Sequence, residues 1–166
     1  MLIRPKASTG QRAQHSPAVL IDRHWTLVDG NAAVPLLTAG AAPELLEPPV
    51  NVLRLSLHPD GMAPRIRNLG EWRAHVLHRL DRQALATGDP VLRALHDDLR
   101  ALPGGRESAQ PAGTVVPLRY AVDGHELSFV SVTSVLGTPL DVTLDELAIE
   151  SFLPADAATA AFLRAR

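Results

Sequence analysis

Three side chains with metal-binding chemistry fall at helical spacing in the middle of the sequence. Glu71, His75 and His78 stand at positions i, i+4 and i+7, which places them on one face of a helix. One carboxylate and two imidazoles form a plausible ligand set for a transition metal. The apolar stripe of the same helix lies on the opposite side, so a metal held there would be open to water and its ligands unsupported. We predict a solvated, salt-bridged face and no metal, with a metal site as the alternative.

A second histidine lies close to a carboxylate. His58 and Asp60 could form an acid-base pair, but they belong to the stretch "HPDG", in which proline and Gly61 are typical turn residues. We therefore expect a turn in which Asp60 makes a local side-chain bond. The sequence has no glycine-flanked serine nucleophile and no phosphate-cradling glycine loop. Catalysis is the minority alternative, and we predict that the protein is not an enzyme.

Composition excludes several further classes. The 166 residues suit one domain, and the absence of cysteine rules out disulfides and thiolate ligands. With a net charge of −2 and scattered arginines, the chain is a poor candidate for gripping nucleic acid by itself. No apolar run approaches the roughly 20 residues of a membrane span. We expect a cytoplasmic domain without membrane contact.

The remaining candidates for a functional role are large apolar side chains with a few polar neighbours. Each such side chain is typical of a packed core. Together they could also line a cleft that holds a small ligand and offers it a few polar atoms. Asn51 and Arg54 interrupt an apolar segment and could supply those atoms, although Arg54 could equally extend to solvent. The candidate ligand-binding residues are Trp25, Asn51, Arg54, Leu57, Trp72, Val76, Phe129 and Phe152.

The first elements that must position these residues are a hairpin and a short helix. Alternating apolar residues predict strands at 18–22 and 25–29, joined by a turn at Arg23-His24. Asn31 is the expected N-cap of a short helix that ends at Gly40. Residues 52–57 fit either a strand or a short helix, and periodicity does not decide between them.

Two longer helices follow. Leu69, Trp72, Val76 and Leu80 have spacings of 3, 4 and 4, which predicts a helix over 69–87 closed by a glycine. The dipeptide "DP" at 89–90 starts a second helix, which runs to about residue 102. Because the link is so short, we expect an antiparallel helical hairpin lying over one face of a sheet.

The last third of the chain predicts three strands. They span 114–122, 125–136 and 146–153, and Pro117 confines the first of them to a sheet edge or places the proline at a position that makes no ladder hydrogen bond. Asp123-Gly124 is typical of a type I′ turn. Apolar residues slip in phase near residues 129–130, which indicates a bulge or burial on both faces. Asp156 should cap a short final helix.

This order predicts an α+β fold. We expect an antiparallel sheet of about five strands with helices packed over one face. Two strands, a helical middle and three further strands are also the order of a PAS domain.

Three motifs in this order resemble one family. "DRHWTLVDGNAA", "NVLRLSLHPDGMAPRIRNLGEWRAHVLHRL" and "GTPLDVTLDELAIESFLPADAATAA" are similar to the ligand-binding domain of MmyB-like transcription regulators, over residues 18–166. The second motif is the most specific. The resemblance implies a PAS-like domain that binds a small apolar molecule, for example a fatty-acid-like ligand. Binding of this ligand would modulate a helix-turn-helix domain.

The resemblance also sets expectations about partners. Residues 1–17 are expected to form a flexible tail, which is too short for the three helices, each averaging roughly 11 residues, of a helix-turn-helix module. We therefore expect any DNA contact to come from a domain outside this chain. The alternative function is a homodimerisation or protein-interaction module with no ligand pocket. No other cofactor is expected.

Overall fold

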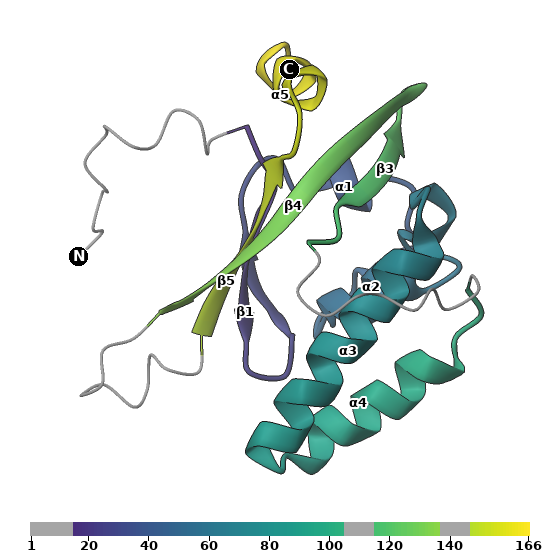
Figure 1. The fold of residues 1–166 in the computed structure, drawn as a ribbon, viewed down its shortest axis with the longest axis vertical. Helices are drawn as coiled ribbons and strands as arrows, with labels where there is room; N and C mark the ends of the chain where they lie inside the picture. The colour runs from purple at the N-terminus through teal and green to yellow at the C-terminus, as the bar shows by residue number, and fades with distance from the viewer. Residues whose placement is uncertain (1–14, 105–114, 137–146) are drawn as a thin grey trace.

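A five-stranded antiparallel sheet forms the centre of the protein in the computed structural model, which describes residues 15–104, 115–136 and 147–166. The strands lie in the order β2-β1-β5-β4-β3 (Figure 1). They are β1 (Ala18–Asp22), β2 (Leu27–Gly30), β3 (Leu118–Val122), β4 (His125–Leu136) and β5 (Leu147–Pro154). The predicted α+β class with an antiparallel sheet is confirmed.

Helices pack against this sheet, and the longer ones lie on one side of it. They are α1 (Pro35–Thr38), α2 (Val52–Leu57), α3 (Leu69–Thr87), α4 (Pro90–Ala101) and α5 (Ala157–Arg164), with 3₁₀ turns η1 (Pro43–Leu45) and η2 (Ala63–Arg65). Figure 1 shows α2 and α3 beside the sheet, α4 farther out, and α5 beyond one end of β4 and β5. The middle of the chain, α1 to α4, therefore forms a helical cover over the strands.

The opening hairpin departs from prediction at its second strand. Trp25 has a φ of 66°, which lies in the left-handed region, so it belongs to the turn. The ladder of β2 begins at Leu27, two residues later than expected, and its register shifts between Leu20 and Ile21. This unusual backbone turns the Trp25 side chain into the core, where it is 5 % exposed.

Asn31 does not cap α1, so that prediction is wrong. The N-cap is Val34, which makes no side-chain cap bond. Asn31 Oδ1 instead accepts from the backbone N–H groups of Ala18 and Ala33, at 3.1 and 3.2 Å. Its Nδ2 donates to the carbonyl of Ser16 at 2.8 Å. Asn31 thus ties the start of β1 to the turn after β2.

The segment that periodicity left open is a helix. Asn51 Oδ1 accepts from the backbone N–H of Arg54 at 3.0 Å, which caps α2. Asn51 also forms an isolated β-bridge with Thr26, so the chain pairs with the hairpin immediately before the helix begins. The capping bond therefore decides in favour of a helix where hydrophobic spacing could not.

The observed bounds of the two long helices agree closely with the predicted ones. Gly88 ends α3 with a φ of 66°, and Asp89 Oδ1 accepts from the backbone N–H of Val91 at 2.8 Å to begin α4. The buried Arg73 side chain donates to the carbonyls of Arg100 and Gly104, at 2.6 and 2.8 Å. These bonds fix the end of α4 against the beginning of α3.

The C-terminal strands follow prediction with two corrections. β3 begins at Leu118, and residues 115–117 are not part of a strand. β3 is an edge strand, as predicted, and Asp123 and Gly124 have φ values of 49° and 78°, as a type I′ turn requires. The register of β4 is continuous through Phe129, so the bulge suggested there is absent. Predicted residues 105–114 and 137–146 lie outside the described residues.

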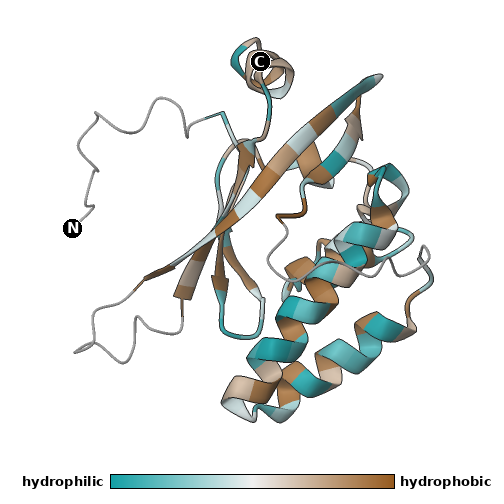
Figure 2. Cartoon of the chain, in the orientation of Figure 1, coloured by the Kyte–Doolittle hydropathy of each residue, from teal (hydrophilic) through white to brown (hydrophobic). Residues whose placement is uncertain are grey.

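The core lies between the sheet and its helical cover. Phe129 and Tyr120 are fully buried on the inner face, and Leu80 and Leu99 are fully buried on α3 and α4. Figure 2 shows hydrophobic residues along the strands, and hydrophobic and hydrophilic residues alternating along α3 and α4, as in amphipathic helices. At the sheet's end, Asp156 Oδ1 accepts from the backbone N–H of Thr159 at 2.7 Å, which caps α5 as predicted.

Candidate ligand-binding site

A cavity of about 200 Å³ lies under the helical cover. Its wall comes from β1, β2, β5, α1, α2 and α3, so both the sheet and the helices that lie on it contribute to the cavity. Most of the lining is apolar, and includes Val19, Leu27, Leu37, Val50 and Leu53. Leu46, which is 39 % exposed, also lines the cavity, so its wall reaches the protein surface there. This shape suits a small, largely apolar molecule.

Four of the eight predicted ligand-binding residues meet in this cavity. They are Trp25, Trp72, Val76 and Phe152. Trp72 Nε1 donates to Ser56 Oγ at 2.9 Å, so the indole is held and Ser56 contributes a hydroxyl to the wall. A ligand-binding role for these residues stays a prediction, but the structure gives them a common space.

The other four predicted residues do not line the cavity. Asn51 is used as the α2 cap and donates to the His24 carbonyl at 3.0 Å. Arg54 points outward and pairs with Asp98 at 2.8 Å, with 40 % of its side chain exposed. Leu57 and Phe129 are core residues, 1 % and 0 % exposed. The two polar atoms expected from this segment are therefore committed elsewhere.

Polar chemistry in the cavity comes instead from a buried ion pair between α3 and β5. Arg79 Nη1 and Nη2 donate to the two carboxylate oxygens of Glu150 at 2.8 and 2.7 Å. Ser131 and Thr133 donate their hydroxyls to the same carboxylate, each at 2.6 Å. The Glu150 side chain is 6 % exposed and that of Arg79 is 28 % exposed. Both residues line the cavity.

The ion pair sets the charge of Glu150. Burial alone would raise the pKa of the Glu150 carboxyl, but the bonds and charge of Arg79 and the two hydroxyls more than reverse this. Its pKa therefore lies below the ordinary value, and Glu150 is ionised at neutral pH. Four donors occupy the carboxylate, which is about the number it can accept.

Trp25 connects the ion pair to the opening hairpin. The guanidinium carbon of Arg79 lies 4.6 Å from the centre of the Trp25 ring, in cation-π geometry. Trp25 Nε1 donates to Gln83 Oε1 at 2.8 Å. Trp72, Val76, Arg79 and Gln83 are spaced by 4, 3 and 4 residues on α3, so one stripe of this helix carries both the apolar and the polar wall.

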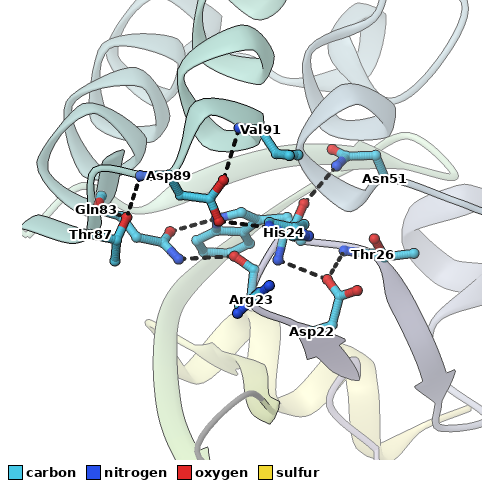
Figure 3. A network of polar contacts seen from close by, with 10 residues as sticks. Asp22, Arg23, His24, Thr26, Asn51, Gln83, Thr87, Asp89 and Val91 are labelled. Atoms are coloured by element: carbon cyan, nitrogen blue, oxygen red, sulfur yellow. Dashed lines mark hydrogen bonds and ion pairs between the residues drawn. The ribbon is translucent and has the colours of Figure 1, made fainter. Parts of the chain in front are cut away.

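A polar network holds the turn that carries Trp25. Figure 3 shows this turn between β1 and β2 packed against the junction of α3 and α4. His24 Nε2 lies 2.8 Å from Asp89 Oδ2, and Asp22 Oδ1 accepts from the backbone N–H groups of His24 and Thr26. The contact with His24, together with the Val91 N–H, lowers the pKa of Asp89. The network therefore fixes one wall of the cavity to the helical hairpin.

Sequence reasoning missed Arg79, Gln83 and Glu150. A signal for them existed, because Arg79 interrupts the apolar stripe of α3 at helical spacing. Glu150 likewise lies between Ala148 and Phe152, which are partly buried against the core on the same strand face. Two opposite charges on facing apolar surfaces indicate a buried pair, but no spacing rule connects residues that far apart.

The histidine face of α3 is only partly solvated. Glu71 and His78 are exposed, and Glu71 Oε2 accepts from Asn68 Nδ2 at 3.2 Å. His75 is half-buried, its ring centre 5.4 Å from that of Trp72, so the predicted full solvation is wrong for His75. Burial and the charge of Arg79 lower its pKa. Within the described residues, no group of three His, Asp or Glu side chains is placed to hold a metal.

The "HPDG" segment is a turn, as predicted. The backbone N–H of Gly61 donates to the His58 carbonyl at 2.9 Å. The local side-chain bond comes from His58 rather than Asp60, since His58 Nδ1 accepts from the Asp60 N–H at 3.1 Å. A Cβ atom on Gly61 would lie 2.2 Å from the Leu55 carbonyl oxygen, so only glycine fits.

Comparison with protein families agrees with this architecture. The family model for the MmyB-like transcription regulator ligand binding domain matches residues 11–165, nearly the whole chain. Comparisons with curated proteins and with solved structures give no match. No helix in the described ranges is long and apolar enough to cross a membrane. The family describes a regulatory ligand-binding domain, not an enzyme, and the chain belongs to this family of MmyB-like transcription regulator ligand-binding domains.

Proposed function

We propose that the domain senses a small, largely aliphatic molecule in the cavity between its sheet and α1–α3. The observation that carries this proposal is an apolar cavity of about 200 Å³ in a regulatory ligand-binding domain. Its effect would be to modulate a helix-turn-helix domain, attached or partnered, which makes the contacts with DNA. The role is regulatory rather than catalytic.

The cavity volume limits the ligand. An engineered apolar cavity of roughly 150 Å³ binds benzene, whereas drug-sized ligands usually occupy about 300 Å³ or more. A volume of about 200 Å³ therefore favours a short aliphatic chain. A longer, fatty-acid-like chain would have to extend past the exposed Leu46.

Trp25 offers a route from the ligand to the rest of the domain. It lines the cavity, bonds to Gln83 on α3, and belongs to the turn held by the His24–Asp89 contact. A ligand that moves the Trp25 ring would change how this turn sits on the helical hairpin. Regulation requires that the ligand bind one of these arrangements more tightly than the other.

Thermal unfolding with a panel of C6 to C12 aliphatic alcohols and amides tests the proposal. Ligands that bind the folded state raise its Tm by mass action. Val76→Phe fills the cavity and should abolish the shift, whereas Val91→Phe, at a half-exposed position on α4, should keep it. If no member of the panel shifts the Tm of the natural sequence, or both variants respond equally, the proposal fails.

A second candidate is homodimerisation through the helix-free side of the sheet. Val132 and Leu153 are 41 % and 39 % exposed, and their side chains point to the side opposite Glu150 by strand alternation. Val132→Glu would then convert a concentration-dependent dimer into a monomer in light scattering. A natural sequence that is monomeric at every concentration would exclude this role.

A further inference from the structure

The ion pair in the cavity restricts the head group of the ligand. Arg79 is the cation of this wall, and a carboxylate ligand would need its charge. Arg79 already gives two charged bonds to Glu150, a bidentate arrangement that fixes the geometry of both groups. The positive charge is therefore neutralised before any ligand arrives.

The hydrogen-bonding capacity of the pair is unevenly used. Glu150 accepts from Arg79 twice, from Ser131 and from Thr133, which fills a carboxylate's acceptor positions. Arg79 has five N–H donors, and its contacts with Glu150 and Thr133 use three. Its Nε–H and one Nη1–H have no acceptor among the described residues. The unused hydrogen-bonding groups of the ion pair are therefore donors, and they belong to Arg79.

A carboxylate ligand would also meet a like charge. Glu150 is ionised and lines the cavity beside Arg79. Two carboxylates sharing one site disfavour each other's charged forms. A neutral oxygen atom can accept from Arg79 without adding a second negative charge to the low-dielectric cavity.

We infer that the cavity selects an uncharged aliphatic molecule with an oxygen acceptor, such as an alcohol, ketone, ester or amide, over the carboxylate of equal length. This inference rests on the proposed function and specifies its ligand class. At roughly 30 Å³ per water-sized group, the cavity of about 200 Å³ holds about seven such groups. A six-carbon ligand is therefore the appropriate probe.

Hexanamide and hexanoate form a matched pair, because they are isosteric and differ in charge. The chain has two tryptophans, Trp25 and Trp72, and both line the cavity, so their fluorescence reports binding. At pH 7 we expect hexanamide to bind at least tenfold more tightly than hexanoate. Equal affinity, or a preference for hexanoate, overturns the inference while the ligand-binding role stands. If neither probe binds and the aliphatic panel also fails, both proposals fall.

Glu150→Gln tests the cause of the discrimination. The variant keeps the shape of the side chain, removes its charge and leaves Arg79 with an unpaired cation, so hexanoate should become the tighter ligand. Unchanged selectivity in a folded Glu150→Gln protein contradicts the inference.

A second measurement needs no variant. At pH 5 about a sixth of hexanoate is protonated if its carboxyl resembles that of glutamate, so its affinity should rise roughly twofold. Hexanamide does not titrate and serves as the control. A hexanoate affinity that does not rise relative to hexanamide overturns the inference even if Glu150→Gln fails to fold.

Discussion

Replacing Arg79 with methionine tests whether the buried ion pair governs this part of the core. The substitution keeps much of the aliphatic stem and removes the guanidinium, leaving Glu150 with 6 % of its side chain exposed and only two hydroxyl donors. Breaking a buried pair by removing one partner costs about 3–5 kcal/mol. Because both hydroxyl bonds remain and Arg79 is 28 % exposed, we expect the low end, about 3 kcal/mol.

Urea unfolding at pH 7 measures this loss directly. For a chain of 166 residues it corresponds to a fall in Tm of roughly 6–12 °C. Arg82→Met is the matched control, since Arg82 is exposed on the same helix and its loss should change stability by no more than about 0.5 kcal/mol. The double variant Arg79→Met/Glu150→Leu removes both charges and should regain most of the stability.

The pH dependence separates this explanation from simple loss of packing. In the natural sequence the pKa of Glu150 is depressed, so its stabilising effect is present above the carboxyl's unfolded pKa and is lost only as pH falls through the lower, folded value. Without Arg79, burial raises the pKa of Glu150, and acid neutralises the orphaned charge. The difference between Arg79→Met and the natural sequence should therefore shrink from pH 7 to pH 5. A loss below about 1 kcal/mol, or one that is independent of pH, would refute this reasoning.

Three further predictions concern the surrounding scaffold. Asn51→Ala removes the cap of α2 and the bond to the His24 carbonyl, so chemical denaturation should show a loss of about 1–2 kcal/mol, which Asn51→Asp should partly recover. Gly61→Ala places a Cβ atom 2.2 Å from the Leu55 carbonyl oxygen and should destabilise by about 2 kcal/mol or more, whereas Gly104→Ala meets only an ordinary contact at 3.4 Å; equal thermal stability of the two would contradict the steric argument. Burial and Arg79 depress the pKa of His75, so the unfolded state binds more protons and stability falls as pH drops below about 6.5. His75→Gln should therefore make the urea midpoint depend less on pH between pH 7 and pH 5, and a pH dependence equal to that of the natural sequence would contradict this explanation.

The long helices were predictable because their signals are local. The stripe from Leu69 to Leu80, the glycine after α3 and the Asp89 cap all act within a few residues. The Asp123-Gly124 turn is equally local, and it aligned β3 with β4 correctly. The backbone at Trp25 was not predictable, because a left-handed tryptophan is held there by contacts with α3 and the segment at Asn51.

The residues of the candidate site also divide into those that the sequence predicts and those that only tertiary packing brings together. Trp25, Trp72, Val76 and Phe152 were predicted because large apolar residues of a two-layer fold must meet between its layers. Arg79 and Glu150 were missed because each charge alone reads as a surface residue, and only tertiary packing brings them together. Asn51 and Arg54 were assigned to the pocket because they are polar residues within an apolar segment, whereas in the structure Asn51 caps a helix and Arg54 forms a surface ion pair.

Two-dimensional ¹H–¹⁵N NMR of the indole groups tests the central claim most directly. The indole N–H groups of Trp25 and Trp72 donate to Gln83 and Ser56, and both rings line the cavity. On titration with hexanamide the account predicts that both indole signals shift together and saturate, and that Val76→Phe removes the response. Indole signals that stay fixed while hexanamide and the longer aliphatic ligands are added would contradict a ligand site in this cavity.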